Sequence, residues 1–199
     1  MEGNLDPKER QALTKFVRSY VQKLGQLLDK LDIEALAQII DQIERVRAEG
    51  RTIYIIGNGG SSATASHMAE DLAFGTRLRE GARVRALSLT DNQPYITAVA
   101  NDMGFDHVFE EQLRNMLQPG DVVVAISASG NSPNVVKAIE FANSQGAVSV
   151  GLVGFDGGRL KEISQITIHV PTDHGEYGPV EDIHLILDHI IIGYLIEMG

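Results

Sequence analysis

Histidine and carboxylate side chains recur at helical spacing in two distant parts of the chain. His67 and Asp71 are four residues apart, so on a helix they share one face, one turn apart. A second set of ionisable residues lies in an otherwise apolar segment near the C-terminal end: Glu181, His184, Asp188 and His189. Because unpaired charges are costly inside a protein, this segment predicts partners for them.

Two kinds of chemistry would use such a set. Any one of these histidines, taken alone, is best explained as a hydrogen-bonded residue of the core or the surface. Taken together, two imidazoles and two carboxylates suit zinc or a similar divalent metal, or an acid–base pair, and the residues that would form it are His67, Asp71, Glu181 and His189. The sequence leaves open whether the two segments meet, within one subunit or between subunits.

Two glycine-bearing loops indicate a site for an anion. Each follows an apolar run and precedes helix-forming residues; they read Gly57-Asn58-Gly59-Gly60-Ser61-Ser62 and Ser127-Ala128-Ser129-Gly130-Asn131-Ser132. Glycine lets the backbone approach a ligand, and a helix start offers unpaired N–H groups and a positive dipole end. Serine and asparagine also cap ordinary turns, so one such loop would be weak evidence. Two of them at neighbouring strand ends favour a phosphate site.

Neither loop fits a nucleotide-binding motif. Gly57 and Gly59 match the first two glycines of G-x-G-x-x-G, but the third position is Ser62, and no acidic residue closes a second strand about 20 residues further on. The lysine and adjacent hydroxyl residue of a P-loop are also missing.

The hydrophobic pattern predicts the elements that must position these residues. Short apolar runs alternate with segments of helical spacing, which indicates a doubly wound, five-stranded parallel α/β sheet. We expect strands at 53–56, 84–89, 122–127, 147–153 and 166–170, a helix directly after Ser62, and further helices at 93–101, 106–117, 133–145, after 157–158, and at 180–198.

Two amphipathic helices are expected ahead of the first strand, at 7–30 and 32–49. We therefore expect a single domain over 1–199, with an N-terminal helical hairpin in 1–50 and an α/β core in 51–199. The apolar face of the first helix would pack either on its own sheet or on another copy of the chain. We favour the second arrangement, a homo-oligomer.

Composition narrows the function classes. The formal charge of −10 argues against broad binding to nucleic acid or to an anionic membrane surface. No cysteine is present, so disulfides and thiolate metal sites are excluded. The first residues contain no apolar segment typical of a secretory signal, and the apolar stretch at 183–196 is too short and too polar to span a bilayer. We expect a soluble, cytoplasmic protein.

Several motifs, in this order, resemble those of the SIS (sugar isomerase) domain, and within it the phosphoheptose isomerase group. The resemblance covers nearly the whole chain. It includes GNGGS at 57–61, the His67–Asp71 pair, AND-x-GF at 100–105, S-x-SGNS at 127–132, DGG at 156–158, and a final helix with Ile183-His184 and a later His189.

The resemblance implies a flavodoxin-like fold, a homotetramer with active sites between subunits, and isomerisation of sedoheptulose 7-phosphate to D-glycero-D-manno-heptose 7-phosphate through a cis-enediolate. It implies catalytic roles for Asp71, Glu181 and His189, and a divalent metal, zinc, at His67, Asp71, Glu181 and His189. It assigns the sugar phosphate to Asn58, Gly59, Gly60, Ser61, Asn101, Asp102, Ser127, Ala128, Ser129, Ser132 and Glu181.

The chain departs from the family pattern at four positions. Asp71 stands where glutamate is usual, Glu181 where glutamine is usual, Ala128 where threonine is common, and Gly75 where an arginine is often found. A carboxylate at Asp71 is one methylene shorter, and a misplacement of ~1 Å can cost ~100-fold in rate. Two alternatives therefore stay open: an isomerase of another sugar phosphate, and a non-catalytic module that binds a sugar phosphate or a partner protein.

Overall fold

A five-stranded, all-parallel sheet forms the centre of the computed structural model, which describes residues 5–198. The strand order is β2-β1-β3-β4-β5, the flavodoxin-like order, in which the chain reverses direction across the sheet between β1 and β3. The predicted doubly wound sheet is confirmed. Its strands are β1 (Thr52–Gly57), β2 (Arg85–Ser88), β3 (Val122–Ser127), β4 (Val148–Val153) and β5 (Ile166–His169).

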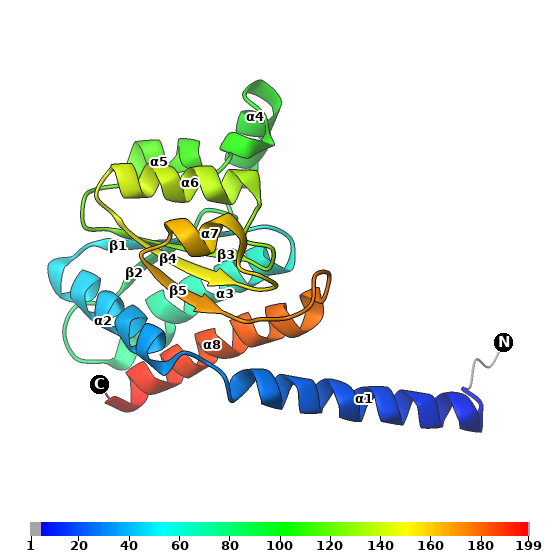
Figure 1. Ribbon diagram of the computed structural model, residues 1–199. Coiled ribbons are helices and arrows are strands. Elements are labelled where there is room, and N and C mark those ends of the chain that lie inside the picture. Colours follow the sequence, from blue (N-terminus) through cyan, green and yellow to red (C-terminus); the bar gives the residue numbers. More distant parts are fainter. Residues whose placement is uncertain (1–4, 199) are drawn as a thin grey trace.

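Helices cover both faces of the sheet (Figure 1). One face carries α2 (Ile33–Glu49), α3 (Gly60–Ala73) and α8 (Tyr177–Met198); the other carries α5 (Glu110–Met116), α6 (Pro133–Ser144) and α7 (Gly158–Ile163), with α4 (Gln93–Asp102) projecting beyond them. Every residue of β1 and β3 is buried, which explains why these strands read as uninterrupted apolar runs rather than as alternating ones.

The helix boundaries follow local signals in the sequence. Asp6 and Glu9 form a capping box at the start of α1 (Pro7–Leu28), and Gly50 ends α2 in the left-handed conformation, as expected. The helix expected at 106–117 is divided into a 3-10 turn, η2 (Phe105–His107), and α5. Here the N–H groups of Val108 and His107 donate to the carbonyls three residues earlier, those of Phe105 and Gly104, instead of four residues earlier as in an α-helix. A second 3-10 turn, η1 (Gly75–Leu78), follows α3.

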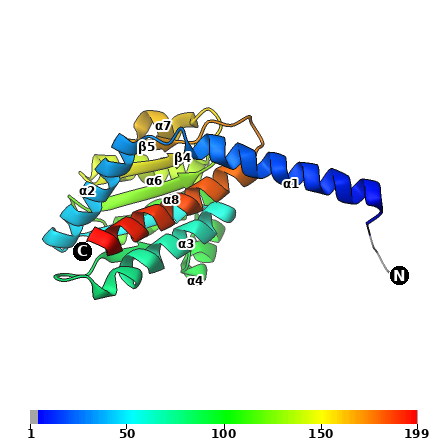
Figure 2. The same ribbon diagram turned by 90° about the horizontal axis from the view of Figure 1, so that it is seen from below.

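The helix α1 extends away from the α/β body instead of folding back along α2 (Figures 1 and 2). Its C-terminal part is held on α8, where the Tyr20 hydroxyl donates to Asp182 at 2.6 Å, and on the residue directly before that helix, where Lys23 pairs with Glu176. The apolar side chains along its outer part are half or more exposed; among them are Leu13, Phe16 and Val21.

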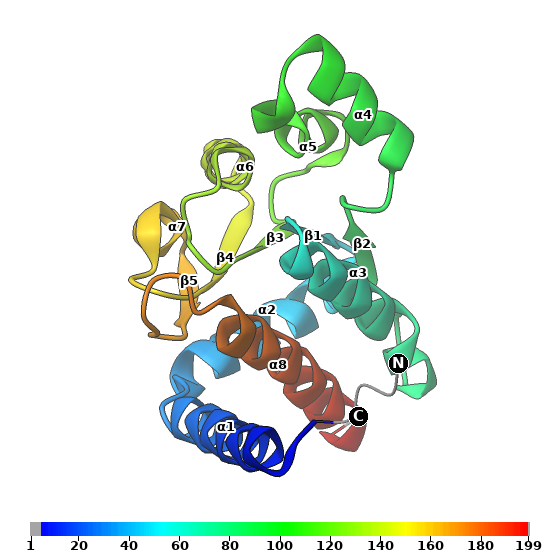
Figure 3. The ribbon, with the colours of Figure 1, turned by 90° about the vertical axis from the view of Figure 1, so that its right-hand side faces the viewer.

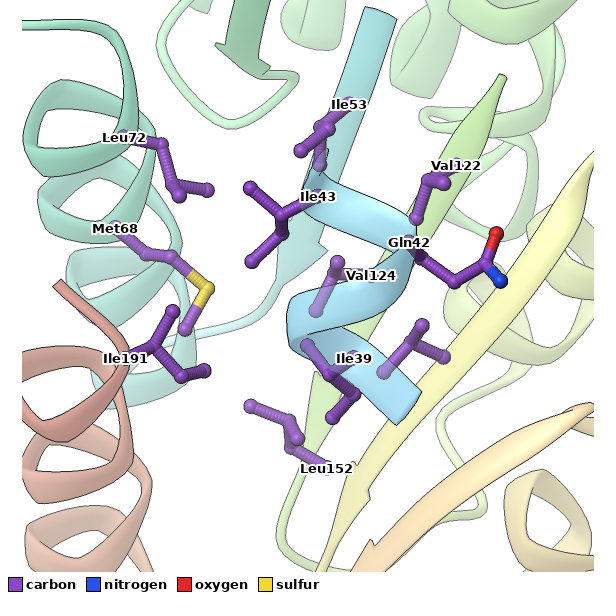
Figure 4. Close-up of a pocket in the computed structure, with 11 residues that line it drawn as sticks. Ile39, Gln42, Ile43, Ile53, Met68, Leu72, Val122, Val124, Leu152 and Ile191 are labelled. Carbon is purple, nitrogen blue, oxygen red and sulfur yellow. The ribbon is translucent and has the colours of Figure 1, made fainter. Parts of the chain in front are cut away.

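A small cavity lies in the core between α2, α3, α8 and the sheet (Figure 4). Its volume of about 20 Å³ is roughly the space of one water molecule, and its lining is almost wholly apolar, including Ile43, Met68 and Ile191. The cavity therefore belongs to core packing and is too small for an organic ligand.

No helix within residues 5–198 is long and apolar enough to cross a membrane.

Candidate active site

The helices α3 and α8 lie side by side and run in the same direction (Figure 3). Gly60 at the start of α3 faces Glu181 near the start of α8, and Gly75, just past α3, lies near Ile192. Between these points, the rings of His67 and His189 are 5.2 Å apart. The two ionisable segments therefore meet within one chain, which the sequence alone left open.

Four side chains from these two helices converge. The potential ligand atoms of His67, Asp71, Asp188 and His189 all lie within 4.8 Å of one another. His67 Nε2 is 3.6 Å from Asp71 Oδ2, and both imidazoles are exposed. Two nitrogen and two oxygen donors form a set that zinc commonly takes. Three of the four residues are those expected from the sequence; Glu181 is outside this group, and Asp188 stands in it instead.

The Asp188 carboxylate is fully buried, and neither of its oxygens has a hydrogen-bond partner within residues 5–198. Burial, and secondarily the nearby Asp71 carboxylate, raise the pKa of Asp188 to about 7. A buried carboxylate without a partner is costly, and a cation bound between the two helices would relieve that cost. The residues present therefore fit a divalent metal.

His184 is also fully buried, on the same helix, and neither of its ring nitrogens has a hydrogen-bond partner in the described part of the chain. Burial lowers the pKa of His184 to about 4, so its imidazole is neutral near pH 7. It does not join the four-residue group.

The side chain of Glu181, a residue of α8, lies against the first residue of α3. A Cβ atom built on Gly60 would collide with the Glu181 carboxylate, which would have to move, so in this structure the carboxylate packs directly against the glycine. A carboxylate is favoured at this position by the positive end of the α3 dipole. Because it already places a negative charge beside the glycine loop, it disfavours a phosphate there.

The serine loop, residues 127–132, lies at the C-terminal end of β3, next to the end of β1. Ser127 and Ser132 Oγ atoms are 3.4 Å apart, and Ser127 Oγ accepts a bond from Gly130 N–H at 3.2 Å. The Ser132 hydroxyl bonds none of the α6 backbone groups among residues 5–198, although Ser132 is the N-cap of that helix. Hydroxyls gathered at a helix start are typical of a phosphate site.

The loop after β4 supports the serine loop. The Leu160 and Arg159 N–H groups donate to the Gly130 carbonyl and to Asn131 Oδ1, both at 2.9 Å. Gly130 has a φ of +63°, and a Cβ atom on it would collide with the Gly157 carbonyl oxygen. The DGG motif at 156–158 therefore holds the serine loop in place by close backbone contact.

The asparagine residues expected at the substrate are placed differently. The side-chain amides of Asn58 and Asn134 exchange two hydrogen bonds of 2.9 Å, which join the glycine loop to the first turn of α6. Asn101 and Asp102 are exposed at the end of α4, where Asn101 donates to Asp102 at 2.7 Å. That helix projects from the opposite face of the sheet to α3 and α8 (Figure 3), so the structure does not bring this pair to the four-residue group.

Comparison with known proteins identifies the family of the chain. Residues 16–154 match the SIS domain, and the chain is 42% identical over 148 residues to the phosphoheptose isomerase of Rhodospirillum rubrum, covering 74% of this chain and 77% of that protein. The chain belongs to the phosphoheptose isomerase group of the SIS domain family. The resemblance seen in the motifs is thereby confirmed.

Other phosphoheptose isomerases match over almost the full length. The protein of Trichlorobacter lovleyi is 35% identical over 190 residues, covering 94% of this chain and 95% of its own. The solved structure from Neisseria gonorrhoeae aligns with a TM-score of 0.82 at 27% identity, over 94% of this chain and 97% of that chain. Phosphoheptose isomerases are aldose–ketose isomerases, and the chain shares both their sequence and their fold.

Proposed function

We propose that the protein isomerises sedoheptulose 7-phosphate to D-glycero-D-manno-heptose 7-phosphate. The observation that carries this proposal is the placement of two sites along α3. The serine loop lies beside the start of α3, and His67 lies seven residues, or about 10 Å, further along that helix. An extended seven-carbon sugar phosphate spans such a distance, with its phosphate at one end and its carbonyl at the other.

The serine loop binds the phosphate. Ser127, Ser129 and Ser132 supply hydroxyls, and the backbone near Gly130 and the start of α6 supply N–H groups and a positive dipole end. Because the Glu181 carboxylate stands at the start of α3, the phosphate is directed to α6 rather than to the glycine loop. Binding energy from this remote group is used to orient the reacting carbons.

The carboxylates and His189 transfer the protons. A carboxylate, Asp71 or Glu181, removes a proton from the carbon next to the carbonyl, and His189 protonates the carbonyl oxygen, which gives a cis-enediolate. The carboxylate then returns the proton to the former carbonyl carbon, while the hydroxyl of the neighbouring carbon gives its proton to His189, which completes the conversion of ketose to aldose and restores both residues.

A divalent metal, zinc, belongs to this site. The imidazole of His67 and the carboxylate of Asp71 would hold it, and the imidazole of His189 would join them in the form that carries no extra proton. When bound, the metal polarises the carbonyl oxygen of the sugar as a Lewis acid.

The working form is a homo-oligomer, a tetramer with active sites shared between subunits. The exposed apolar side chains of α1 support this proposal, as does a second apolar surface formed by α2 and α8 that includes Ile33, Ile40 and Tyr194. A second copy of the chain could cover both surfaces at once. The cytoplasmic location expected from the sequence stays a prediction.

The test is an assay of sedoheptulose 7-phosphate with the purified protein, following the aldose product by NMR. We expect turnover by the wild type and a loss of at least ~100-fold in His189→Ala, and similar losses in Asp71→Ala or Glu181→Ala, whichever is the base. Ser132→Ala, in the serine loop, should raise KM. Ser144→Ala, at the far end of α6, is its matched control and should leave KM unchanged. Undiminished turnover in all three acid–base variants would exclude this mechanism.

A second candidate, an isomerase of another sugar phosphate, is favoured by the shorter side chain at Asp71. A panel of ketose phosphates of five to seven carbons, assayed with and without a chelator, separates the two. Binding of every sugar phosphate without turnover of any would instead indicate a non-catalytic module.

A further inference from the structure

The carboxylate of Asp188 lies between α3 and α8 with no solvent exposure. Its two oxygens are without a hydrogen-bond partner in residues 5–198, and no lysine or arginine of that part of the chain forms an ion pair with it. A buried carboxylate in this state costs several kcal/mol unless a cation or a proton compensates it.

The groups that face Asp188 are potential metal ligands, and none of them is a lysine or an arginine. They are the carboxylate of Asp71 and the imidazoles of His67 and His189, all with ligand atoms within 4.8 Å of one another and of Asp188. The group contains two carboxyl side chains and neither lysine nor arginine, so a divalent cation would complement its charge. A metal cation bound among these four residues would therefore compensate the buried Asp188 carboxylate.

Glu181 lies in a different place on the same helix. It precedes Asp188 by seven residues, which is a rise of about 10 Å along α8. Its carboxylate is in contact with Gly60, at the start of α3, whereas His67 and Asp71 lie two and three turns further along. To reach a metal at His67, Glu181 would have to leave the favourable end of the α3 dipole.

We propose that Asp188, and not Glu181, completes the metal site with His67, Asp71 and His189. The second aspartate makes up for the short side chain of Asp71, because two aspartates from adjacent helices enclose the ion from both sides. Glu181 is then free of the metal and available for proton transfer. This proposal rests on the proposed function only in requiring a divalent metal, and not in the identity of the sugar.

The experiment measures metal binding without substrate. Full-length protein is stripped with a chelator, and zinc affinity is determined by competition with a chromophoric chelator for the wild type, Asp188→Asn and Glu181→Gln. We expect Asp188→Asn to weaken zinc affinity by ~100-fold or more and Glu181→Gln to change it less than about 3-fold. Both substitutions replace one carboxylate by an amide, so each is the matched control of the other.

Thermal unfolding supplies an independent readout. In the metal-free protein, Asp188→Asn and the apolar variant Asp188→Leu should unfold at a higher temperature than the wild type, since each removes a buried charge. Addition of zinc should raise the unfolding temperature of the wild type and of Glu181→Gln, but not of the Asp188 variants. If the Asp188 variants are more stable than the wild type and still lose zinc binding, misfolding cannot be the cause of that loss.

Zinc affinity lost in Glu181→Gln and retained in Asp188→Asn would overturn the proposal, and so would a wild type that binds no divalent metal. Zinc binding of the expected pattern in a protein that does not turn over sedoheptulose 7-phosphate would overturn only the proposed function.

Discussion

The hydroxyl of Tyr20 donates a hydrogen bond of 2.6 Å to Asp182, the residue that follows Glu181. This bond joins α1, which extends from the body, to the turn of α8 that carries a proposed catalytic carboxylate. The bond to Asp182 raises the pKa of Tyr20 to about 12, so the phenol remains protonated, and the bond intact, at any pH below about 10. The position of α1 is therefore linked to the position of Glu181.

Replacing Tyr20 by phenylalanine should loosen this link. We expect Tyr20→Phe to lower the free energy of unfolding by about 1 kcal/mol, the usual net value of one hydrogen bond, and to reduce kcat more than it raises KM. Urea unfolding and steady-state kinetics are the measurements. Tyr177→Phe, a change of the same kind at an exposed position of α8, should leave both unaffected. Equal effects of the two substitutions would contradict a positioning role for Tyr20.

Removal of His184 should change the dependence of stability on pH. Burial holds the pKa of His184 near 4, while in the unfolded chain it lies near 6.5. Between these values the unfolded state binds a proton that the folded state does not, so the stabilisation is complete above pH 6.5 and is lost as the pH falls. The loss between pH 7.5 and pH 5 is about 2 kcal/mol. Urea unfolding at the two pH values should show a smaller drop in His184→Leu than in the wild type.

The control for this experiment is His174→Gln, since His174 is exposed. Its drop in stability between the two pH values should equal that of the wild type. An unchanged drop in His184→Leu would mean that other groups cause the loss of stability in acid.

Substitution of Gly130 should disrupt the serine loop. Gly130→Ala places a Cβ atom against the Gly157 carbonyl at a φ of +63°, whereas Gly146→Ala meets only Pro119 Cβ, at 3.7 Å, with a φ of +77°. Both carry the cost of a left-handed alanine, about 1 kcal/mol, but only Gly130→Ala must displace backbone. We expect KM for the sugar phosphate to rise at least ~10-fold in Gly130→Ala alone. Similar KM values in the two variants would show that the loop tolerates displacement.

A charge on the exposed face of α1 should dissociate the oligomer. Phe16 is 66% exposed in the single chain, and we expect Phe16→Glu to give monomers in analytical ultracentrifugation. Lys15→Glu also makes the helix more negative, but Lys15 lies outside the apolar side of α1, about 100° around the helix from Phe16, and the change should leave the assembly intact. Oligomers that persist in Phe16→Glu would place the interface elsewhere.

The sequence was sufficient for the fold and for the position of the serine loop at the end of β3. β3 begins and ends at the predicted residues, because its uninterrupted apolar run stops at the polar Ser127 loop. Alternating strand and helix patterns predict a parallel sheet, and in such a sheet loops that follow neighbouring strands lie at the same edge.

The choice between Glu181 and Asp188 could not be made in this way. Seven residues are nearly two full turns, so the two side chains differ in direction by only about 20° around α8. Helical periodicity therefore does not distinguish Glu181 from Asp188. Only the position of α8 along α3 shows that Asp188, and not Glu181, lies beside His67. In the same way, no local pattern indicates that α4 would carry Asn101 and Asp102 away from the sheet.

The paired amides of Asn58 and Asn134 join the C-terminal ends of β1 and β3. They connect the serine loop, where we place the phosphate, to the glycine loop that precedes α3. A sugar phosphate bound at the serines would therefore also restrain the start of the helix that carries His67. Recognition of the phosphate and alignment of the reacting carbons would then depend on the same pair of amides.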